Sequence, residues 1–135
     1  MSIALAPVVV FAYNRPLHLR RTLDALAACR LAARTEVHVF ADGPKKPAAA
    51  EAVTEVRGVL AREAEAGRFA AFHVHASDAN LGLANSIIRG VGQVLAAHGR
   101  VIVLEDDLLV SADFLEFMND CLAFYEDDAM VGAVT

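Results

Sequence analysis

The stretch Val101-Ile102-Val103-Leu104-Glu105-Asp106-Asp107 decides the predicted fold, because its four apolar residues run directly into three carboxylates. A short, largely β-branched and uninterrupted apolar run is typical of a strand that is buried on both faces, near the centre of a parallel sheet. The three acids then follow the carboxyl end of this strand. In open α/β sheets this is the edge at which ligands bind.

Adjacent carboxylates repel one another and are costly to desolvate, and a divalent cation beside them would remove most of that cost. Mg²⁺ and Mn²⁺ prefer oxygen ligands, and Mg²⁺ is often held by one or two carboxylates together with substrate phosphates. Taken by itself, the stretch is equally compatible with a metal–phosphate site and with a solvated acidic turn before the next helix.

Other apolar runs predict strands at 7–12, 36–41 and 69–75, and the start of a fifth strand at 130–135. Amphipathic patterns between them predict helices, including 47–66 and 83–97. Their inward residues are expected to be Leu19, Leu23 and Leu26 on the first helix, and Ile87, Ile88, Val91 and Leu95 on 83–97. This alternation predicts an α/β fold, a Rossmann-like, doubly wound and mostly parallel sheet with helices on both faces, as a single domain over residues 1–135.

The composition excludes several classes of protein. Apolar residues make up 56% of the 135 residues, which argues against disorder, and the net charge of −5 without a basic run argues against nucleic-acid binding. Cys29 and Cys121 are the only cysteines and give neither a disulfide framework nor a zinc-binding spacing. No apolar run approaches the length of a membrane span, so the expected location is cytoplasmic.

In such a sheet, every loop that follows a strand lies on the same edge, so residues 13–15, 42, 77–82 and 105–107 should converge. Tyr13 could stack on a nucleobase or pack against the first helix. Arg15 could contact a phosphate or be solvated. Asp42 could accept a hydrogen bond from a base or sugar, or could bond its own backbone in the Asp-Gly-Pro turn.

Two histidines alternate along the predicted third strand. His73 and His75 therefore share one face and form a candidate metal pair. His18, His38 and His98 are scattered in the sequence, so no third ligand is apparent. The favoured interpretation is a half-buried pair of side chains on a strand.

Four segments, in order, resemble glycosyltransferases of the glycosyltransferase-A fold, which are nucleotide-diphospho-sugar transferases. Residues 7–16 resemble the opening strand and loop of that family, and Phe40-Ala41-Asp42-Gly43 resembles its second strand and aspartate. Asn80-Leu81-Gly82-Leu83-Ala84 resembles the Asn-x-Gly segment before the third helix. Residues 104–108, with 111–114 downstream, are similar to the Asp-x-Asp-type metal motif in the Glu-Asp-Asp form of the N-acetylglucosaminyltransferase I group and bacterial family-2 relatives.

The resemblance implies a metal-dependent glycosyltransferase, or its donor-binding half, acting on a UDP-sugar. By position, Asp107 would bind Mn²⁺ or Mg²⁺, which bridges the diphosphate of the nucleotide-sugar donor. Asp106 would contact the ribose or the metal shell, and Glu105 would support the ribose side. Asp42 would accept the uracil N–H, and the nucleotide pocket would be lined by Ala12, Tyr13 and Arg15.

One departure from the family pattern concerns the second half. In the family the acceptor site and catalytic base follow the fifth strand, and this sequence ends there, at Thr135. The expectation is therefore an N-terminal part of a longer enzyme or a naturally short form, with the base beyond Thr135 and an acceptor that could be a glycan, lipid or protein. An open sheet edge could also pair two copies.

Two other classes remain as alternatives. A sugar-phosphate nucleotidyltransferase would normally show a Gly-rich, basic loop after the first strand, and Tyr13-Asn14-Arg15-Pro16 lacks it. A non-catalytic domain, whether receiver-like, nucleotide-binding or an interaction domain, would use its acids as a regulatory or structural cluster. Receivers place an acidic pair after the first strand, where this sequence has Tyr13-Asn14.

Overall fold

The computed structural model describes residues 5–124, and within them the chain forms a four-stranded parallel sheet. The strand order is β3-β2-β1-β4, with the strands at Val8–Ala12 (β1), Glu36–Ala41 (β2), Ala71–Ala76 (β3) and Ile102–Glu105 (β4). The predicted strand at 130–135 lies outside the described residues. The four strands within them are found where the sequence predicts strands, and the α/β class is confirmed.

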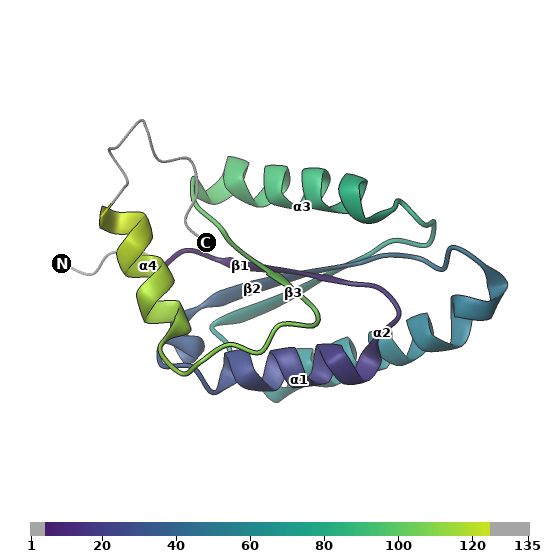
Figure 1. Ribbon diagram of the computed structural model, residues 1–135, viewed down its shortest axis with the longest axis horizontal. Coiled ribbons are helices and arrows are strands. Elements are labelled where there is room, and N and C mark those ends of the chain that lie inside the picture. Colours follow the sequence, from purple (N-terminus) through teal and green to yellow (C-terminus); the bar gives the residue numbers. More distant parts are fainter. Residues whose placement is uncertain (1–4, 125–135) are drawn as a thin grey trace.

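Helices cover both faces of the sheet (Figure 1). Helices α1 (Pro16–Ala27) and α2 (Ala50–Ala66) lie against one face, and α3 (Leu83–His98) lies against the other (Figure 1). Helix α4 (Phe114–Phe124) follows β4, and short 3₁₀ turns occupy Ala32–Arg34 and Pro47–Ala49. Within residues 5–124, no helix combines the length and the apolar character needed to cross a membrane.

Strand β1 is the centre of the core, since all five of its residues are buried. Its Val8, Val10 and Ala12 belong to the large apolar cluster that also contains the α1 residues Leu19, Leu23 and Leu26, each fully buried as predicted. Its other face contributes Val9 and Phe11 to a smaller cluster under α3.

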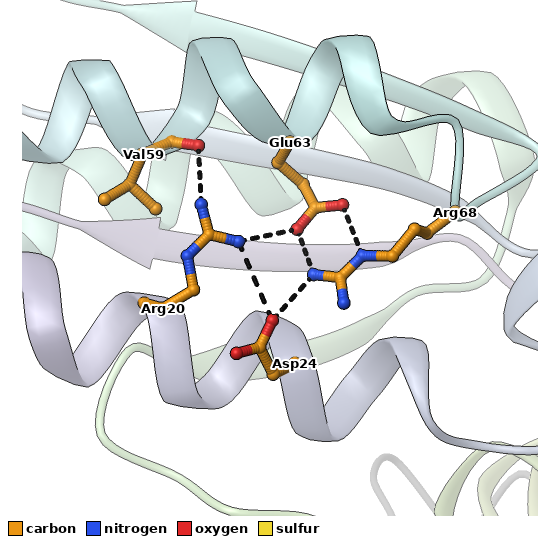
Figure 2. A network of polar contacts seen from close by, with 5 residues as sticks. All are labelled: Arg20, Asp24, Val59, Glu63 and Arg68. Atoms are coloured by element: carbon orange, nitrogen blue, oxygen red, sulfur yellow. Dashed lines mark hydrogen bonds and ion pairs between the residues drawn. The ribbon is translucent and has the colours of Figure 1, made fainter.

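A network of charged side chains joins α1 to α2 (Figure 2). The carboxylate of Glu63, on α2, is fully buried and accepts hydrogen bonds from the guanidinium groups of Arg20 and Arg68. Arg68 also contacts Asp24 on α1 at 2.9 Å, and Arg20 donates to the Val59 carbonyl oxygen at 3.3 Å. The hydrogen bonds to Glu63 raise the pKa of Arg68, so this guanidinium stays charged beside the buried carboxylate.

The prediction that the acidic strand is buried on both faces is wrong. Strand β4 is an outer strand among the described residues and pairs with β1 alone, not with a neighbour on each side. Its Ile102 and Leu104 are buried against the α1 side, whereas Val103 is 44% exposed. The continuous apolar run therefore reflects one buried face and one partly exposed face.

The predicted inward face of α3 is partly wrong. Ile87 and Val91 pack against the smaller apolar cluster, but Ile88 is 70% and Leu95 39% exposed. The buried residues of α3 are Ser86, Gly90 and Val94, four residues apart. A Cβ atom at Gly90 would lie 2.9 Å from the Phe40 ring, so the helix approaches the sheet at a position without a side chain.

Candidate functional site

A cavity of about 290 Å³ lies at the carboxyl ends of β1, β2 and β4 and at the start of α3. Of the residues predicted from the sequence to form a site, five line this cavity: Ala12, Tyr13, Arg15, Asp42 and Asp106. Glu105 and Asp107 belong to the same loop region but are not part of the lining. The loops after all four described strands thus meet at one edge of the sheet, as the parallel topology requires.

Arg15 connects the loop after β1 to the acidic stretch after β4. Its Nη2 donates to Asp106 Oδ1 at 2.8 Å, and its Nη1 lies 3.6 Å from Asp107 Oδ2. Asp106 is 4% exposed, and its burial raises the pKa of the carboxyl group. The charge of Arg15 opposes that increase in the pKa, whereas the neighbouring Asp107 adds to it.

Asp106 is also fixed through its backbone. The Thr22 hydroxyl, buried on α1, lies 2.9 Å from the Asp106 carbonyl oxygen and 2.8 Å from that of Leu108, and it can donate to either. The loop after β4 is therefore attached to α1 by a side chain that the sequence analysis did not consider. A threonine inside an otherwise leucine-rich helical face is the signal that could have indicated it.

Asp42 organises the neighbouring loop. Its Oδ1 accepts from the backbone N–H groups of Gly43 and Leu81 at 2.9 and 2.8 Å. Its Oδ2 accepts from the Gly82 N–H and the Asn80 side-chain amide at 3.0 and 3.2 Å. These four bonds use the acceptor sites that a carboxylate offers.

Asp42 therefore bonds its own backbone, as one of the two sequence interpretations states, and it also holds the loop before α3. The role of accepting a uracil N–H stays a prediction. It would require one of these four donors to move.

Gly43 allows the two loops to lie this close. A Cβ atom at this position would lie 2.4 Å from the backbone oxygen of Asp78. The backbone of the loop after β2 therefore packs directly against the backbone of the loop after β3. This close packing lets Asp42 accept hydrogen bonds from the backbone N–H groups of Leu81 and Gly82.

The remaining walls of the cavity combine aromatic rings with two cations. Phe11 and Phe40 line it from neighbouring strands, with ring centroids 5.9 Å apart. Tyr13 is half-buried, and its hydroxyl accepts a hydrogen bond from the Lys45 backbone N–H at 2.9 Å. Arg15 and Lys45 both line the cavity, so an anion entering it would meet positive charge.

A second cavity of about 240 Å³ lies beside the first and shares Phe40, Asp42 and Ser86 with it. Arg89, Gln93 and His75 line this second space. Pockets for small molecules typically measure about 300 to 1,000 Å³, so the two neighbouring spaces are each suited to only part of a nucleotide sugar.

The acidic stretch offers the oxygen ligands that a hard divalent ion prefers. Asp106 is buried and paired with Arg15, while the Asp107 side chain is 40% exposed beside the same guanidinium. Within the described part of the chain, residues 105–107 do not bring three carboxylate oxygens within 4.8 Å of one another. The arrangement fits an ion that takes one carboxylate from the protein and its other oxygens from phosphate and water, as Mg²⁺ commonly does.

A group that the sequence predicts only in part, through His73 and His75, lies on the α3 side of the sheet. We define the histidine cluster as Glu36, His38, His73, His75 and His98. His38 and His73 are register partners on β2 and β3, and their rings stack with centroids 4.5 Å apart. The expectation that His38 and His98 are scattered is therefore wrong, because the parallel pairing of β2 with β3 and the end of α3 bring all four histidines together.

Comparison of the sequence with models of known protein families finds no match, and comparison with curated proteins finds none either. The functional conclusion therefore depends on the geometry described above and on the sequence resemblance.

Proposed function

We propose that this protein binds a nucleoside-diphosphate sugar, with UDP as the favoured nucleotide, as the donor of a metal-dependent glycosyltransferase. The single observation that carries the proposal is the cavity at the carboxyl ends of the strands, where the loop cations meet the acidic stretch after β4. A nucleotide presents an aromatic base, a polar sugar and a charged diphosphate, and the cavity offers a complement to each.

The base and ribose are assigned to the interior of the cavity. The ring of Tyr13 and the apolar wall of Phe11 and Phe40 offer contact area to a planar base. The Asp106 carboxylate is buried and accepts a hydrogen bond from Arg15. We assign it as the acceptor for a ribose hydroxyl. Asp42 acts here as a positioning residue, because three of its four hydrogen bonds hold residues 80–82 beside the cavity.

The diphosphate is assigned to the mouth of the cavity beside Arg15 and Lys45. Asp107 would hold Mn²⁺ or Mg²⁺ there, and Arg15 would exchange its 3.6 Å contact with Asp107 for a phosphate oxygen. The bound ion would supply Lewis-acid stabilisation of the negative charge on the leaving diphosphate when the bond to the anomeric carbon breaks. The protein's own residues bind the donor, orient its phosphates and exclude water from the base.

Calorimetric titration with UDP, in the presence and absence of Mn²⁺, tests this proposal. We expect Mn²⁺ to increase the affinity for UDP by at least about 10-fold, which corresponds to about 1.4 kcal/mol of binding free energy. Asp107→Asn should remove the gain from Mn²⁺ and leave the weak metal-free binding unchanged. Asp120→Asn, the same change at an exposed aspartate on α4, is the matched control and should bind as the wild type does.

Two results would contradict the proposal. One is the absence of binding to UDP, GDP and other nucleoside diphosphates in either condition. The other is a gain from Mn²⁺ that survives in Asp107→Asn.

A further inference from the structure

The histidine cluster has a carboxylate at its centre. Glu36 Oε1 lies 3.0 Å from Nε2 of His38 and 3.0 Å from Nε2 of His73, and Glu36 Oε2 lies 3.9 Å from Nε2 of His98. Three imidazole nitrogens, from β2, β3 and the end of α3, thus face one carboxylate. One ligand atom each from Glu36, His38 and His98 lies within 4.8 Å of the others.

These separations match the spacing of ligands around one ion. Two ligands that each lie about 2 Å from a tetrahedral zinc ion are about 3.3 Å apart, and the separations of 3.0 and 3.9 Å bracket that value. A nitrogen-rich set with one carboxylate suits a borderline transition ion such as Zn²⁺, whereas Mg²⁺ prefers oxygen ligands alone.

A second contact orients one of the imidazoles. His38 Nδ1 lies 3.0 Å from His75 Nε2, and the two rings stack with centroids 5.3 Å apart. When His38 Nδ1 donates its proton to His75, Nε2 of His38 is left with a free lone pair on the side of Glu36. Metal-binding histidines are commonly fixed in this way, by a hydrogen bond from the ring nitrogen that does not bind the metal.

The proposed ligands lie away from the nucleotide cavity, although His75 of the cluster lines the neighbouring second cavity. Glu36 is the first residue of β2 and Asp42 follows the last, so about 20 Å of extended strand lies between them. The side chains are also reachable from solvent, since those of Glu36 and His98 are each about one-third exposed. An ion could therefore enter without unfolding of the sheet.

We propose that Glu36, His38 and His98, with water as a fourth ligand, form a zinc-class metal site that fastens the end of α3 to β2. The site is distinct from the Mn²⁺ or Mg²⁺ position at Asp107 and takes a different class of ion. Its ligands come from β2 and from the end of α3, which are far apart in the sequence, so a bound ion cross-links the helix to the sheet and stabilises the folded state.

The test uses the full chain without an affinity tag. It measures Zn²⁺ affinity by calorimetry, the melting temperature with and without Zn²⁺, and the visible spectrum with Co²⁺ as the probe. We expect binding of one ion, a higher melting temperature with Zn²⁺ than with Mg²⁺, and the intense visible bands of four-coordinate Co²⁺. His98→Gln, at the solvent-exposed end of α3, should weaken Zn²⁺ binding by at least about 10-fold and abolish the gain in melting temperature.

His18→Gln is the matched control, because His18 is exposed on α1 and lies outside the histidine cluster. It should bind Zn²⁺ as the wild type does. The proposal is overturned if the wild type binds neither Zn²⁺ nor Co²⁺. It is also overturned if His98→Gln and His38→Gln bind as tightly as His18→Gln, which would mean that the cluster is held by hydrogen bonds alone.

Discussion

The Arg15 guanidinium lies 2.8 Å from the Asp106 carboxylate, although 91 residues separate them in the sequence. The contact joins the carboxyl ends of β1 and β4, the two strands whose loops form the cation-bearing and the acidic sides of the cavity. The contact keeps the positive charge of Arg15 at the place where we expect a diphosphate to bind. It also gives the nearly buried Asp106 carboxylate a hydrogen-bond donor and a counter-charge. The stability of this edge and the proposed binding of a nucleotide therefore depend on the same pair.

Removal of Arg15 should destabilise the protein through Asp106. Arg15→Met leaves the buried carboxylate without its counter-charge, and we expect the free energy of unfolding to fall by about 2 kcal/mol. In an Asp106→Asn background, Arg15→Met should lower the free energy of unfolding by less than it does in the wild type. We expect this difference, the coupling energy between the two residues, to be about 1 to 2 kcal/mol. Urea denaturation of the two single variants and the double variant measures this coupling, and strictly additive effects would show that the contact contributes nothing.

The network between α1 and α2 makes a second prediction. Arg68→Met leaves the buried Glu63 with only Arg20, at 3.3 Å, and should lower the free energy of unfolding by about 3 kcal/mol. Arg62→Met, the same change at an exposed arginine on α2, should alter it by less than about 0.5 kcal/mol. Chemical denaturation compares the two, and equal effects would mean that the buried ion pair is not needed for helix packing.

Two glycines of α3 should respond in opposite ways to alanine. Within residues 5–124, no neighbouring atom lies within 4 Å of the point where a Cβ at Gly92 would stand, so Gly92→Ala should stabilise the helix by about 0.5 to 1 kcal/mol. At Gly90 the added methyl group would lie 2.9 Å from the Phe40 ring, and the overpacking should cost about 1 to 3 kcal/mol. Thermal denaturation of both variants checks this, and stabilisation by Gly90→Ala would show that α3 lies farther from the sheet.

The same glycine explains why the orientation of α3 was not predictable from its large apolar residues. The apolar pattern of the sequence predicts Ile88 and Leu95 as inward residues, yet the helix turns Ser86, Gly90 and Val94 to the sheet. The space beside the rings of Phe11 and Phe40 determines which face of α3 can approach the sheet. These rings belong to β1 and β2, so the sequence of α3 does not reveal them. By contrast, Leu19, Leu23 and Leu26 pack with valines of the sheet, so their helical spacing was enough to predict their burial.

The candidate site was predictable to the extent that topology determines it. A parallel sheet places the residues after each strand at one edge, and this brought Tyr13, Arg15, Asp42 and Asp106 together as expected. The four hydrogen bonds to Asp42 depend on how two loops pack against each other, which periodicity does not encode. The histidine cluster depends on strand register, which pairs His38 with His73, and on the length of α3, which brings His98 to the same face.

The two cysteines should differ in their reaction with iodoacetamide. Burial raises the pKa of the Cys29 thiol, which also donates a hydrogen bond to the Ser111 carbonyl oxygen at 3.2 Å. Because the thiolate is the reactive form, Cys29 should be alkylated only after unfolding, whereas the half-buried Cys121 should react in the native protein. Mass spectrometry of the modified peptides distinguishes the two sites, and equal native-state labelling would contradict the burial of Cys29.

The most direct measurement is an amide NMR titration of the ¹⁵N-labelled protein with UDP, followed by a substoichiometric amount of paramagnetic Mn²⁺. Binding at the proposed cavity should shift the amide signals of residues 12–15 and 80–82, and Mn²⁺ should then broaden those of 105–107. The amides of Glu36 and His98 report on the histidine cluster and should stay sharp. Broadening there instead, or UDP-induced shifts that avoid the loops after β1 and β4, would contradict nucleotide binding at this edge of the sheet.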